Sequence, residues 1–379
     1  MKINVCRVCG QKFFDKSLLV YKNMPAVAQN FPDEKSLKSD MGIEMKVYQC
    51  SGCGLVQLSN EPVSYYKEVI RAVAFSPEMR NFRVKQFGDF VKKYSLKNKR
   101  VIEIGCGKGE YLSIMKQCGV SVYGLEQSTE SVSRCVKDGL KVFQGFVKDS
   151  RYKIKNAPYD AFFILSFLEH LPDPNSVLGG ICDNLSDNAV GIIEVPNFDM
   201  ILKQNLFSEF TRDHLFYFTK DTLVRLLGLN GFDVIGCRVV WHEYIISAIV
   251  KKRARISVEH FYKKQEKLKL EISRYISRFK DNKVAIWGAG HQSLAVMAML
   301  DLAGKIKYVV DSAPFKQGKY TPATHIPIVS PETLNLDPVA GLIVMAASYS
   351  DEVVSILRKR FDKNFSISVV RDYGLEIIR

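Results

Sequence analysis

The fold is decided by the stretch Val101-Ile-Glu103-Ile-Gly105-Cys-Gly107-Lys-Gly109-Glu110-Tyr-Leu. A short apolar run leads into glycines at every second position, and a stretch with helical character follows. Glycine allows backbone N–H groups to approach a ligand where a Cβ atom would clash. The stretch therefore predicts a strand, a glycine turn and a helix. The glycine pattern alone does not identify the ligand, because dinucleotide sites use similar loops.

Two carboxylates narrow the choice of ligand. Glu103 lies in the strand just before the loop, and Glu126 ends the next strand. An acid at the end of that second strand can bind both ribose hydroxyls of a nucleotide. The form E-x-G-x-G-x-G resembles the S-adenosylmethionine (SAM) loop of class I methyltransferases. In that family the acid at the Glu103 position supports the methionine end of SAM, and the one at the Glu126 position holds the ribose. NAD is the alternative ligand.

A later segment resembles the same family. Tyr159-Asp160-Ala-Phe-Phe-Ile-Leu-Ser166-Phe-Leu-Glu169-His170-Leu-Pro-Asp-Pro174 has the form of its fourth strand and exit loop. The resemblance implies that Ser166 to Glu169 line the methionine side, whereas His170 is expected to cap a helix or support its neighbours. The predicted cofactor-binding residues are Glu103, Gly105, Gly107, Gly109, Glu126, Gln127, Ser166 and Glu169.

Two series of strands alternate with helix-like stretches, which predicts βαβ units and parallel sheets. The expected strands are 100–104, 120–125, 141–144, 160–166 and 189–195, then 284–287, 306–310, 341–346 and 366–370. We therefore predict an α/β protein: an N-terminal Cys₄ zinc-binding domain, a Rossmann-like SAM methyltransferase domain and a second Rossmann-like α/β domain. The predicted boundaries are 1–60 for the zinc domain, 61–98 for a helical connector, 99–250 for the SAM domain, 251–282 for a basic helical linker and 283–379 for the last domain.

Composition limits the function classes. The 379 residues are 47% hydrophobic and 25% charged, which excludes collagen-like and wholly disordered chains. No apolar run is long enough to span a membrane and no secretory signal is visible, so we expect a cytoplasmic protein with no membrane partner. The net charge is +14, and residues 251–280 hold eleven Lys/Arg against three Glu. A solvated helix face explains that excess, although an anionic partner is also compatible with it.

Four cysteines near the start have the spacing of metal ligands. Cys6-Arg-Val-Cys9 and Cys50-Ser-Gly-Cys53 are C-x-x-C pairs, each followed by glycine. Two such turns complete a tetrahedral Cys₄ site that suits Zn²⁺. Because no ligand position remains for water, we expect a structural zinc, with redox or unrelated cysteines as the alternative.

The arrangement along the whole chain resembles the nucleotide-sugar C-methyltransferases. The matching runs are Tyr48-Gln-Cys50-Ser-Gly-Cys53-Gly-Leu-Val-Gln57 near the start, Val284-Ala-Ile-Trp-Gly288-Ala-Gly290, and Val309-Val-Asp311-Ser-Ala-Pro-Phe-Lys316 near the end. The resemblance implies an enzyme that methylates a carbon next to a keto group of a dTDP-sugar or a related nucleotide sugar. It also implies that the last domain helps to bind the sugar nucleotide and packs on the SAM domain.

The family's catalytic stretch corresponds to Thr211-Arg212-Asp213-His214-Leu-Phe-Tyr217-Phe218. His214 stands in the position of the proposed base, and Asp213 in that of a glutamate beside it. A histidine beside a carboxylate is a reasonable general base near neutral pH. Thr211 stands where the family has tyrosine, and threonine cannot support an enolate as a phenol does. This departure leaves methyl transfer to oxygen or nitrogen open.

Further residues are predicted to bind the substrate. Arg71, Phe75 and Ser76 match a family segment that holds the nucleotide sugar, and Arg71 can meet a phosphate. The alternative for Ser76 is a helix N-cap with Pro77 at the first position. Asn197, after the fifth strand, and Tyr217 complete the predicted substrate set.

The second glycine loop, Gly288-Ala-Gly290 with Asp311 about twenty residues on, has the form of a dinucleotide site. The family resemblance favours sugar-nucleotide binding over NAD there.

The sequence thus predicts a SAM-dependent C-methyltransferase that acts through an enolate and works as a monomer. The rivals are an O- or N-methyltransferase acting on a sugar or another phosphorylated metabolite, a nucleic-acid methyltransferase, and a catalytically inactive binding protein. Against the nucleic-acid reading, no Asn/Asp-Pro-Pro-Tyr/Phe motif follows the fourth strand.

Overall fold

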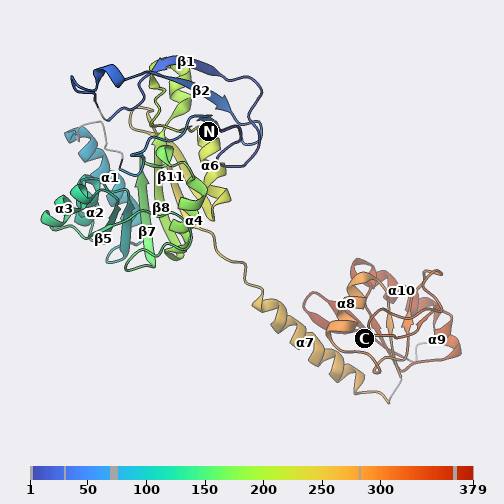
Figure 1. The fold of residues 1–379 in the computed structure, drawn as a ribbon. Coiled ribbons are helices and arrows are strands. Elements are labelled where there is room, and N and C mark those ends of the chain that lie inside the picture. Colours follow the sequence, from blue (N-terminus) through green and yellow to red (C-terminus); the bar gives the residue numbers. More distant parts are fainter. Residues whose placement is uncertain (1–2, 30, 69–75, 281–282, 362–364, 379) are drawn as a thin grey trace. The chain divides into compact units, whose positions relative to one another are not determined.

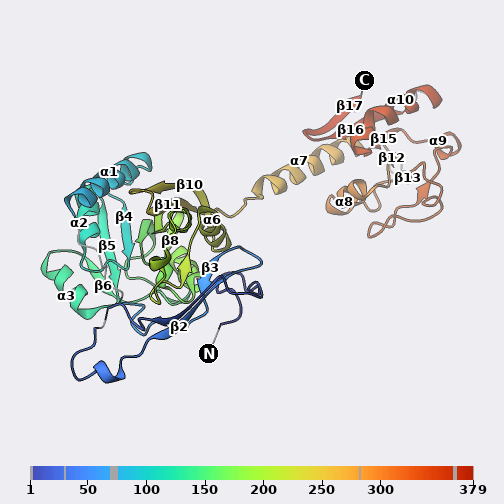
Figure 2. The same cartoon turned by 90° about the horizontal axis from the view of Figure 1, so that it is seen from above.

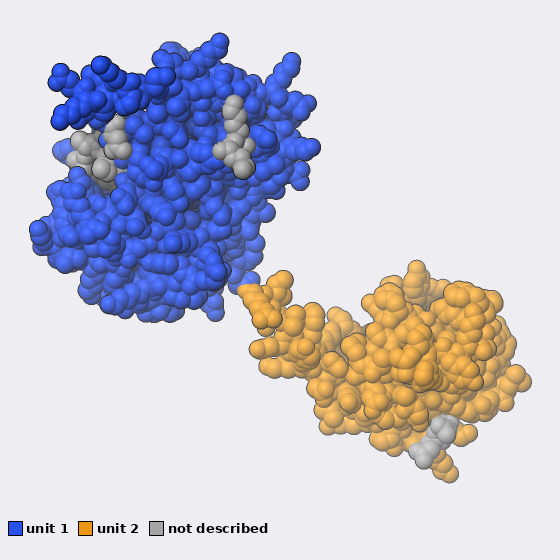
Figure 3. Space-filling model, viewed as in Figure 1, with its two compact units in different colours: residues 1–254 blue, residues 255–379 orange. Residues whose placement is uncertain are grey.

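The computed structural model describes residues 3–29, 31–68, 76–280, 283–361 and 365–378. The chain forms two compact units, Met1–Ala254 and Arg255–Arg379 (Figure 3). Two of the predicted substrate residues, Arg71 and Phe75, lie outside the described residues. No helix of the described part is long and apolar enough to cross a membrane.

A seven-stranded sheet forms the centre of the first unit, in the order β10-β11-β8-β7-β4-β5-β6 (Figures 1 and 2). The five predicted strands are present and parallel to one another. They are β4 (Arg100–Ile104), β5 (Ser121–Glu126), β6 (Val142–Gln144), β7 (Tyr159–Leu165) and β8 (Leu185–Pro196). The antiparallel hairpin of β10 (Phe232–Val240) and β11 (Ile245–Lys252), which extends the sheet beyond β8, was not predicted.

Helices cover both faces of this sheet because successive strand residues point to opposite sides. Val101 and Phe163 face a core with α1 (Pro77–Lys93) and α2 (Glu110–Gln117), and α3 (Thr129–Lys137) adds Cys135. Ile102 and Phe162 face the opposite core with α4 (Pro174–Asp183) and α6 (Lys220–Leu229). The result is the three-layer α/β arrangement expected from the alternating strands and helices.

A separate four-stranded sheet joins the N-terminal segment to the methyltransferase part. Its order is β1 (Leu19–Met24), β2 (Ile43–Gln49), β3 (Val56–Leu58) and β9 (Phe216–Tyr217). Strand β3 follows the second cysteine pair directly, whereas β9 follows His214 almost directly. The antiparallel pairing of Val56 with Tyr217 therefore connects the cysteine-rich segment to the loop of the predicted base. The short helices η1 (Leu37–Ser39), η3 (Phe207–Glu209) and α5 (Phe198–Lys203) complete this region.

The second unit contains a six-stranded sheet in the order β14-β13-β12-β15-β16-β17. Its strands are β12 (Val284–Trp287), β13 (Val309–Val310), β14 (Ile328–Val329), β15 (Gly341–Val344), β16 (Ser366–Arg371) and β17 (Gly374–Ile378). The neighbours from β14 to β16 are parallel, as expected, and only β17 is antiparallel. The helices are α8 (His291–Met299), α9 (Thr333–Leu336), η4 (Ala347–Tyr349) and α10 (Ser350–Arg360).

The basic stretch forms helix α7 (Glu259–Ile276), which packs on the second sheet. Ile272 and Tyr275 are buried in the core, and the Tyr275 hydroxyl donates to the carbonyl of Ser366 at 2.6 Å. Ile256 and Phe261, earlier in the basic stretch, are exposed. The apolar face therefore covers only the second half of the helix.

Candidate active site and metal site

The first glycine loop has the backbone that its sequence predicts. Gly105, Gly107 and Gly109 have φ values of +72°, +53° and +82°, a region that favours glycine. A Cβ atom at Gly105 would lie 3.0 Å from the Phe167 ring, whereas one at Gly107 would meet nothing within 4 Å. The backbone at Gly107 is therefore open to an approaching ligand.

Glu126 closes the base of this loop through two backbone amides. Its carboxylate accepts hydrogen bonds from Gly107 N–H at 2.8 Å and from Ser128 N–H at 2.9 Å. Glu126 is buried at the end of β5, and no cation contacts its carboxylate among the described residues. A ribose placed here would meet an acid at the position that the sequence assigns to it.

A pocket adjoins the same loop. Gly105 and Gln127 line it together with Phe167, and its remaining walls are mostly apolar: Lys67, Ile104, Leu125, Gly145, Phe146, Val147 and Val177. This mostly apolar lining lies next to the acid that the sequence assigns to the ribose. The open backbone at Gly107 is compatible with SAM, in which case Glu126 would hold the ribose and Gln127 would lie beside the adenine.

The other predicted cofactor residues lie at the ends of neighbouring strands. Glu103 is buried in β4, just before the loop. Ser166 follows β7 and is exposed, with a left-handed φ of +49° that is strained for serine. Its N–H donates to the carbonyl of Glu194 at 2.9 Å, which holds this turn against β8. These positions meet at the carboxyl end of the sheet, where ligands bind in open α/β folds.

Glu169 and His170 lie in η2 (Leu168–His170), and His214 lies beside them. Their ligand atoms all fall within 4.8 Å of one another. The rings of His170 and His214 meet edge to face, with centroids 4.8 Å apart. Burial raises the pKa of Glu169 to about 8 and lowers that of His170 to about 4. Burial, together with His170, lowers the pKa of His214 to about 3. Both rings are therefore neutral near pH 7.

His170 has a larger part in the site than its sequence context suggested. Its Nδ1 lies 2.8 Å from the carbonyl of Asp213, so His170 fixes the backbone next to the predicted base. The carboxylate of Asp213 accepts a hydrogen bond from the hydroxyl of Tyr65, which lies 3.0 and 3.1 Å from its two oxygens. Tyr65 had no signal in the sequence, because only the fold brings residues 65 and 213 together.

Arg212, two residues before the predicted base, has a structural role. Its guanidinium donates to the carbonyl of Ala26 at 3.1 Å, and a longer contact of 3.5 Å reaches the carbonyl of Glu61. Arg212 thus attaches the base loop to the N-terminal segment.

Three predicted substrate residues have partners within the protein. Tyr217 is buried, and its hydroxyl accepts from Thr211 N–H at 2.9 Å, which closes the 211–217 loop. Asn197 caps α5 and donates to the carbonyl of Glu243 at 2.7 Å. Ser76 caps α1 by accepting from Met79 N–H at 3.1 Å, with Pro77 at the first helical position.

The four cysteines converge as their spacing predicts. The sulfur atoms of Cys6 and Cys53 are 3.6 Å apart, those of Cys9 and Cys50 are 3.4 Å apart, and all four lie within 4.8 Å of one another. These separations exceed a disulfide bond and suit sulfurs around one ion. Backbone N–H groups and the amide of Gln57, at 3.1 Å from Cys6 Sγ, donate to the sulfurs. Such donors stabilise thiolates and so fit a zinc site.

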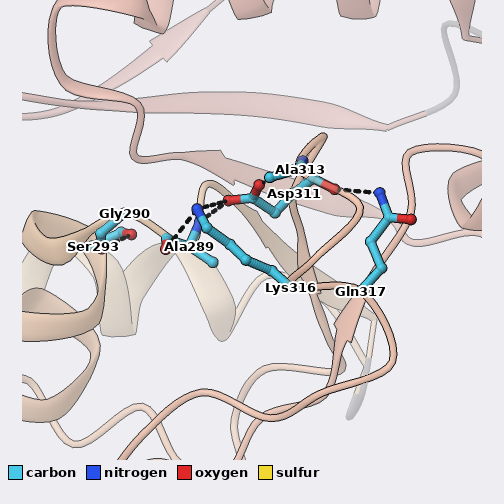
Figure 4. Close-up of polar contacts among 7 residues, drawn as sticks. All are labelled: Ala289, Gly290, Ser293, Asp311, Ala313, Lys316 and Gln317. Carbon is cyan, nitrogen blue, oxygen red and sulfur yellow. Dashed lines mark hydrogen bonds and ion pairs between the residues drawn. The ribbon is translucent and has the colours of Figure 1, made fainter.

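The second glycine loop is organised differently (Figure 4). The carboxylate of Asp311 accepts from Ala289 N–H at 2.8 Å and from Ala313 N–H at 2.9 Å. Lys316 reaches the same carboxylate at 2.9 Å and also donates to the carbonyl of Ala289 at 3.1 Å. The acid that would bind a ribose in a dinucleotide site is thus neutralised by a lysine of its own domain.

Comparison with known proteins agrees with this arrangement. Residues 79–236 match a methyltransferase domain family, and residues 251–369 match the C-methyltransferase C-terminal domain. The C-methyltransferase NovU of Streptomyces niveus is 23% identical over 93% of this chain and 91% of its own length. The ubiquinone biosynthesis O-methyltransferase of Bordetella avium is 34% identical over 22% of this chain and 37% of its own length.

Among solved structures, the magnesium protoporphyrin IX methyltransferase of Synechocystis, with bound SAH, has a TM-score of 0.38 and 16% identity. That match covers 48% of this chain and 90% of the other. The assignment rests on four observations: the glycine loop, the cysteine cluster, the two matched domains and a relative that spans nearly the whole chain. The chain is a SAM-dependent methyltransferase whose last part matches the C-methyltransferase C-terminal domain, and it is similar to a C-methyltransferase over nearly its whole length.

Proposed function

We propose that this enzyme methylates a carbon atom next to the keto group of a nucleotide-linked sugar. The observation that carries the proposal is the position of His214, which is partly exposed, beside His170 and Glu169. Phe167 connects this cluster to the cofactor pocket, because it contacts the Gly105 side of the pocket and lies two residues before Glu169. This connection supports a proton acceptor near the proposed methyl-donor site.

The residues around His214 have separate roles in the proposed reaction. When bound, SAM supplies an electrophilic methyl group. His214, whose ring is neutral near pH 7, accepts the proton from the carbon next to the ketone. Asp213 positions the residues around the base. Its carbonyl holds the ring of His170, and its carboxylate is held by the hydroxyl of Tyr65. Thr211 provides no phenol to the enolate oxygen, and its backbone is occupied by Tyr217.

Methyl-¹³C SAM with a panel of nucleotide sugars, both 4-keto and reduced, tests the acceptor. We expect the label on a ring carbon of a keto sugar, identified by carbon NMR of the product. A label on oxygen or nitrogen would instead support the second candidate, an O- or N-methyltransferase, which the loss of the family tyrosine at Thr211 favours. Transfer to none of the sugars would contradict both.

Replacing the base separates binding from chemistry. We expect His214→Gln to lower kcat by about 10²- to 10⁴-fold, the usual contribution of a general base, and to leave the calorimetric Kd for SAH unchanged. Asp213→Asn is the matched variant, because the carbonyl that holds His170 remains. Its kcat should fall by less than that of His214→Gln. Unchanged turnover in His214→Gln would remove the assignment of the base.

We also propose that Cys6, Cys9, Cys50 and Cys53 bind one structural Zn²⁺. Four sulfurs complete the coordination, so the ion supports the fold and leaves no position for water. Elemental analysis of protein prepared without added zinc should find about one zinc per chain. Cys9→Ser should lose it, whereas Cys118→Ser, outside the cluster, should keep it. A zinc-free wild-type protein with unchanged stability would contradict this assignment.

We also propose a small phosphorylated acceptor, a cytoplasmic location and a monomeric enzyme. The basic stretch is largely the exposed face of α7, whose apolar side packs on the second sheet, so its charge does not require a nucleic acid. Retention of RNA or DNA at physiological salt would argue for the nucleic-acid alternative.

A further inference from the structure

We propose that Tyr244 supplies the hydroxyl that holds the enolate oxygen of the acceptor. The inference rests on the proposed function, because an enolate forms only when the methyl group goes to carbon. When His214 takes the proton from the carbon next to the ketone, the electron pair of the C–H bond moves toward the carbonyl oxygen. A donor placed at that oxygen stabilises the developing charge. Tyr244 donates a hydrogen bond to it and keeps its own proton.

Two successive backbone amides place Tyr244 beside the loop of the predicted base. Asn197 N–H donates to the carbonyl of Tyr244 at 2.8 Å, and the next amide, Phe198 N–H, donates to the carbonyl of Phe218 at 2.9 Å. Tyr244 and the segment that follows His214 are therefore bonded to neighbouring residues at the carboxyl end of β8. Ligands bind at this end of open α/β sheets.

The side chain of Tyr244 reaches the start of the same loop. Its hydroxyl donates to Oε2 of Glu209, two residues before Thr211, at 3.3 Å. This contact is longer than the roughly 2.7–2.8 Å that is usual for O–H···O bonds, so an acceptor oxygen can replace Glu209 as the partner. Tyr244 is 37% exposed, which leaves it accessible to a ligand. Partial burial, together with the carboxylates of Glu209 and Glu169, raises the pKa of Tyr244 to about 12, so the phenol carries its proton at neutral pH.

The turn before Tyr244 is strained. Trp241, His242 and Glu243 have φ values of +49°, +54° and +64°, although none of them is glycine. Such strain persists only where the surrounding contacts impose it, and it is concentrated at functional sites. Here the ring of Trp241 packs on that of Phe82 in α1, with centroids 5.5 Å apart. The turn thus fixes Tyr244 at the start of β11.

The three residues of the reaction cluster are committed to other tasks. A carbonyl only accepts, so the Nδ1 proton of His170 is used in its 2.8 Å bond to the carbonyl of Asp213. His214 is required as the proton acceptor. Glu169 is 1% exposed and is therefore out of reach of an acceptor. Tyr244 adds an accessible donor beside them.

Isotope exchange measures the role of Tyr244 apart from methyl transfer. The probe is the 4-keto nucleotide sugar that takes up the ¹³C label, in D₂O with SAH bound. The wild-type enzyme should exchange the hydrogen next to the ketone, as followed by proton NMR. Tyr244→Phe should lower the exchange rate and kcat together by about 10²- to 10³-fold, the usual effect of losing one donor to an oxyanion. The calorimetric Kd for SAH should stay at the wild-type value, which also shows that the variant is folded.

Tyr21→Phe is the matched control. The Tyr21 hydroxyl donates to the carbonyl of Phe207 at 3.0 Å, so it holds the same short helix, η3, that Tyr244 contacts through Glu209. Its loss should leave the exchange rate and kcat unchanged. Equal losses in both variants would overturn the proposal, because they would show that Tyr244 only supports η3.

The position of the ¹³C label separates this proposal from the proposed function. A label on carbon, with full exchange and full kcat in Tyr244→Phe, would overturn the role of Tyr244 alone. A label on oxygen or nitrogen would overturn the C-methylation and, with it, the need for an enolate donor.

Discussion

The two glycine loops of this protein start from similar sequences and end in different chemistry. In the first, Glu126 accepts two backbone amides and contacts no cation among the residues that the structure describes. In the second, Asp311 also accepts two amides, but Lys316 neutralises it and bonds to the loop itself. The first carboxylate can exchange its amide partners for ribose hydroxyls, whereas the second is part of the domain's internal structure. A glycine motif therefore identifies a ligand site only when its acid is not already paired.

The largest expected difference concerns cofactor affinity. Glu126→Ala should weaken SAH binding on the order of 10- to 100-fold, because a hydrogen bond to a charged group contributes about 1.5–3 kcal/mol. Asp311→Ala should leave the Kd for SAH unchanged and destabilise only the second unit. Isothermal titration calorimetry of both variants measures the contrast. Equal losses of affinity would mean that the second loop also serves the cofactor.

The same substitution should have opposite effects on stability in the two loops. Gly109 begins α2 at a φ of +82°, and a Cβ there would lie 2.6 Å from Leu140. Gly109→Ser should therefore cost about 1–3 kcal/mol through strain and overpacking. Gly290 begins α8 with an extended backbone, and a Cβ would meet nothing within 4 Å. Gly290→Ser should gain a few tenths of a kcal/mol through an N-cap bond.

Differential scanning calorimetry can assign these two effects. SAH should shift only the transition of the first unit, which identifies it in each scan. Destabilisation by both variants would show that the second loop is as tightly constrained as the first.

The smallest expected effect is the pH dependence of the second unit. Burial acts to raise the pKa of Asp311, but hydrogen bonds from Lys316, Ala313 and Ala289 lower it below the usual 3.8. A lowered folded-state pKa gives stability that is present above the unfolded-state value and lost as the pH falls through the folded-state value. Asp311→Asn should remove this loss below about pH 4. Denaturant unfolding from pH 3 to 7 measures the free energy of unfolding of both proteins. If the loss of stability below about pH 4 is the same in Asp311→Asn, the pairing of Asp311 with Lys316 is refuted.

Much of the fold was predictable because apolar periodicity and glycine placement are local signals. Strands β4 and β12 have their predicted bounds, and Ser76 and Pro77 start α1 as their types require. The hairpin of β10 and β11 was missed; β10 is an edge strand in which only Phe232 is buried, and Gly236 interrupts its apolar run. Parallel strands buried on both faces are easier to recognise.

The candidate site was predictable only in part. Motif positions located His214, Glu126 and the cysteines, but not the contacts among them. Tyr65 and Asp213 are 148 residues apart, and their hydrogen bonds depend on tertiary structure alone. Likewise, the bond between Lys316 and Asp311 could not be read from the motif, which made the second loop look like a ligand site.

The pairing of β3 with β9 links the loop of the predicted base, but not the glycine loop, to the N-terminal sheet. The candidate cofactor site is built on β4 and β5, which have no pairing with the N-terminal sheet. The loop that contains His214 is instead held by strand β9, which pairs with β3, the strand that follows the second cysteine pair. Damage to the cysteine cluster by an oxidant or a chelator would therefore produce an enzyme that still holds its methyl donor but can no longer activate an acceptor.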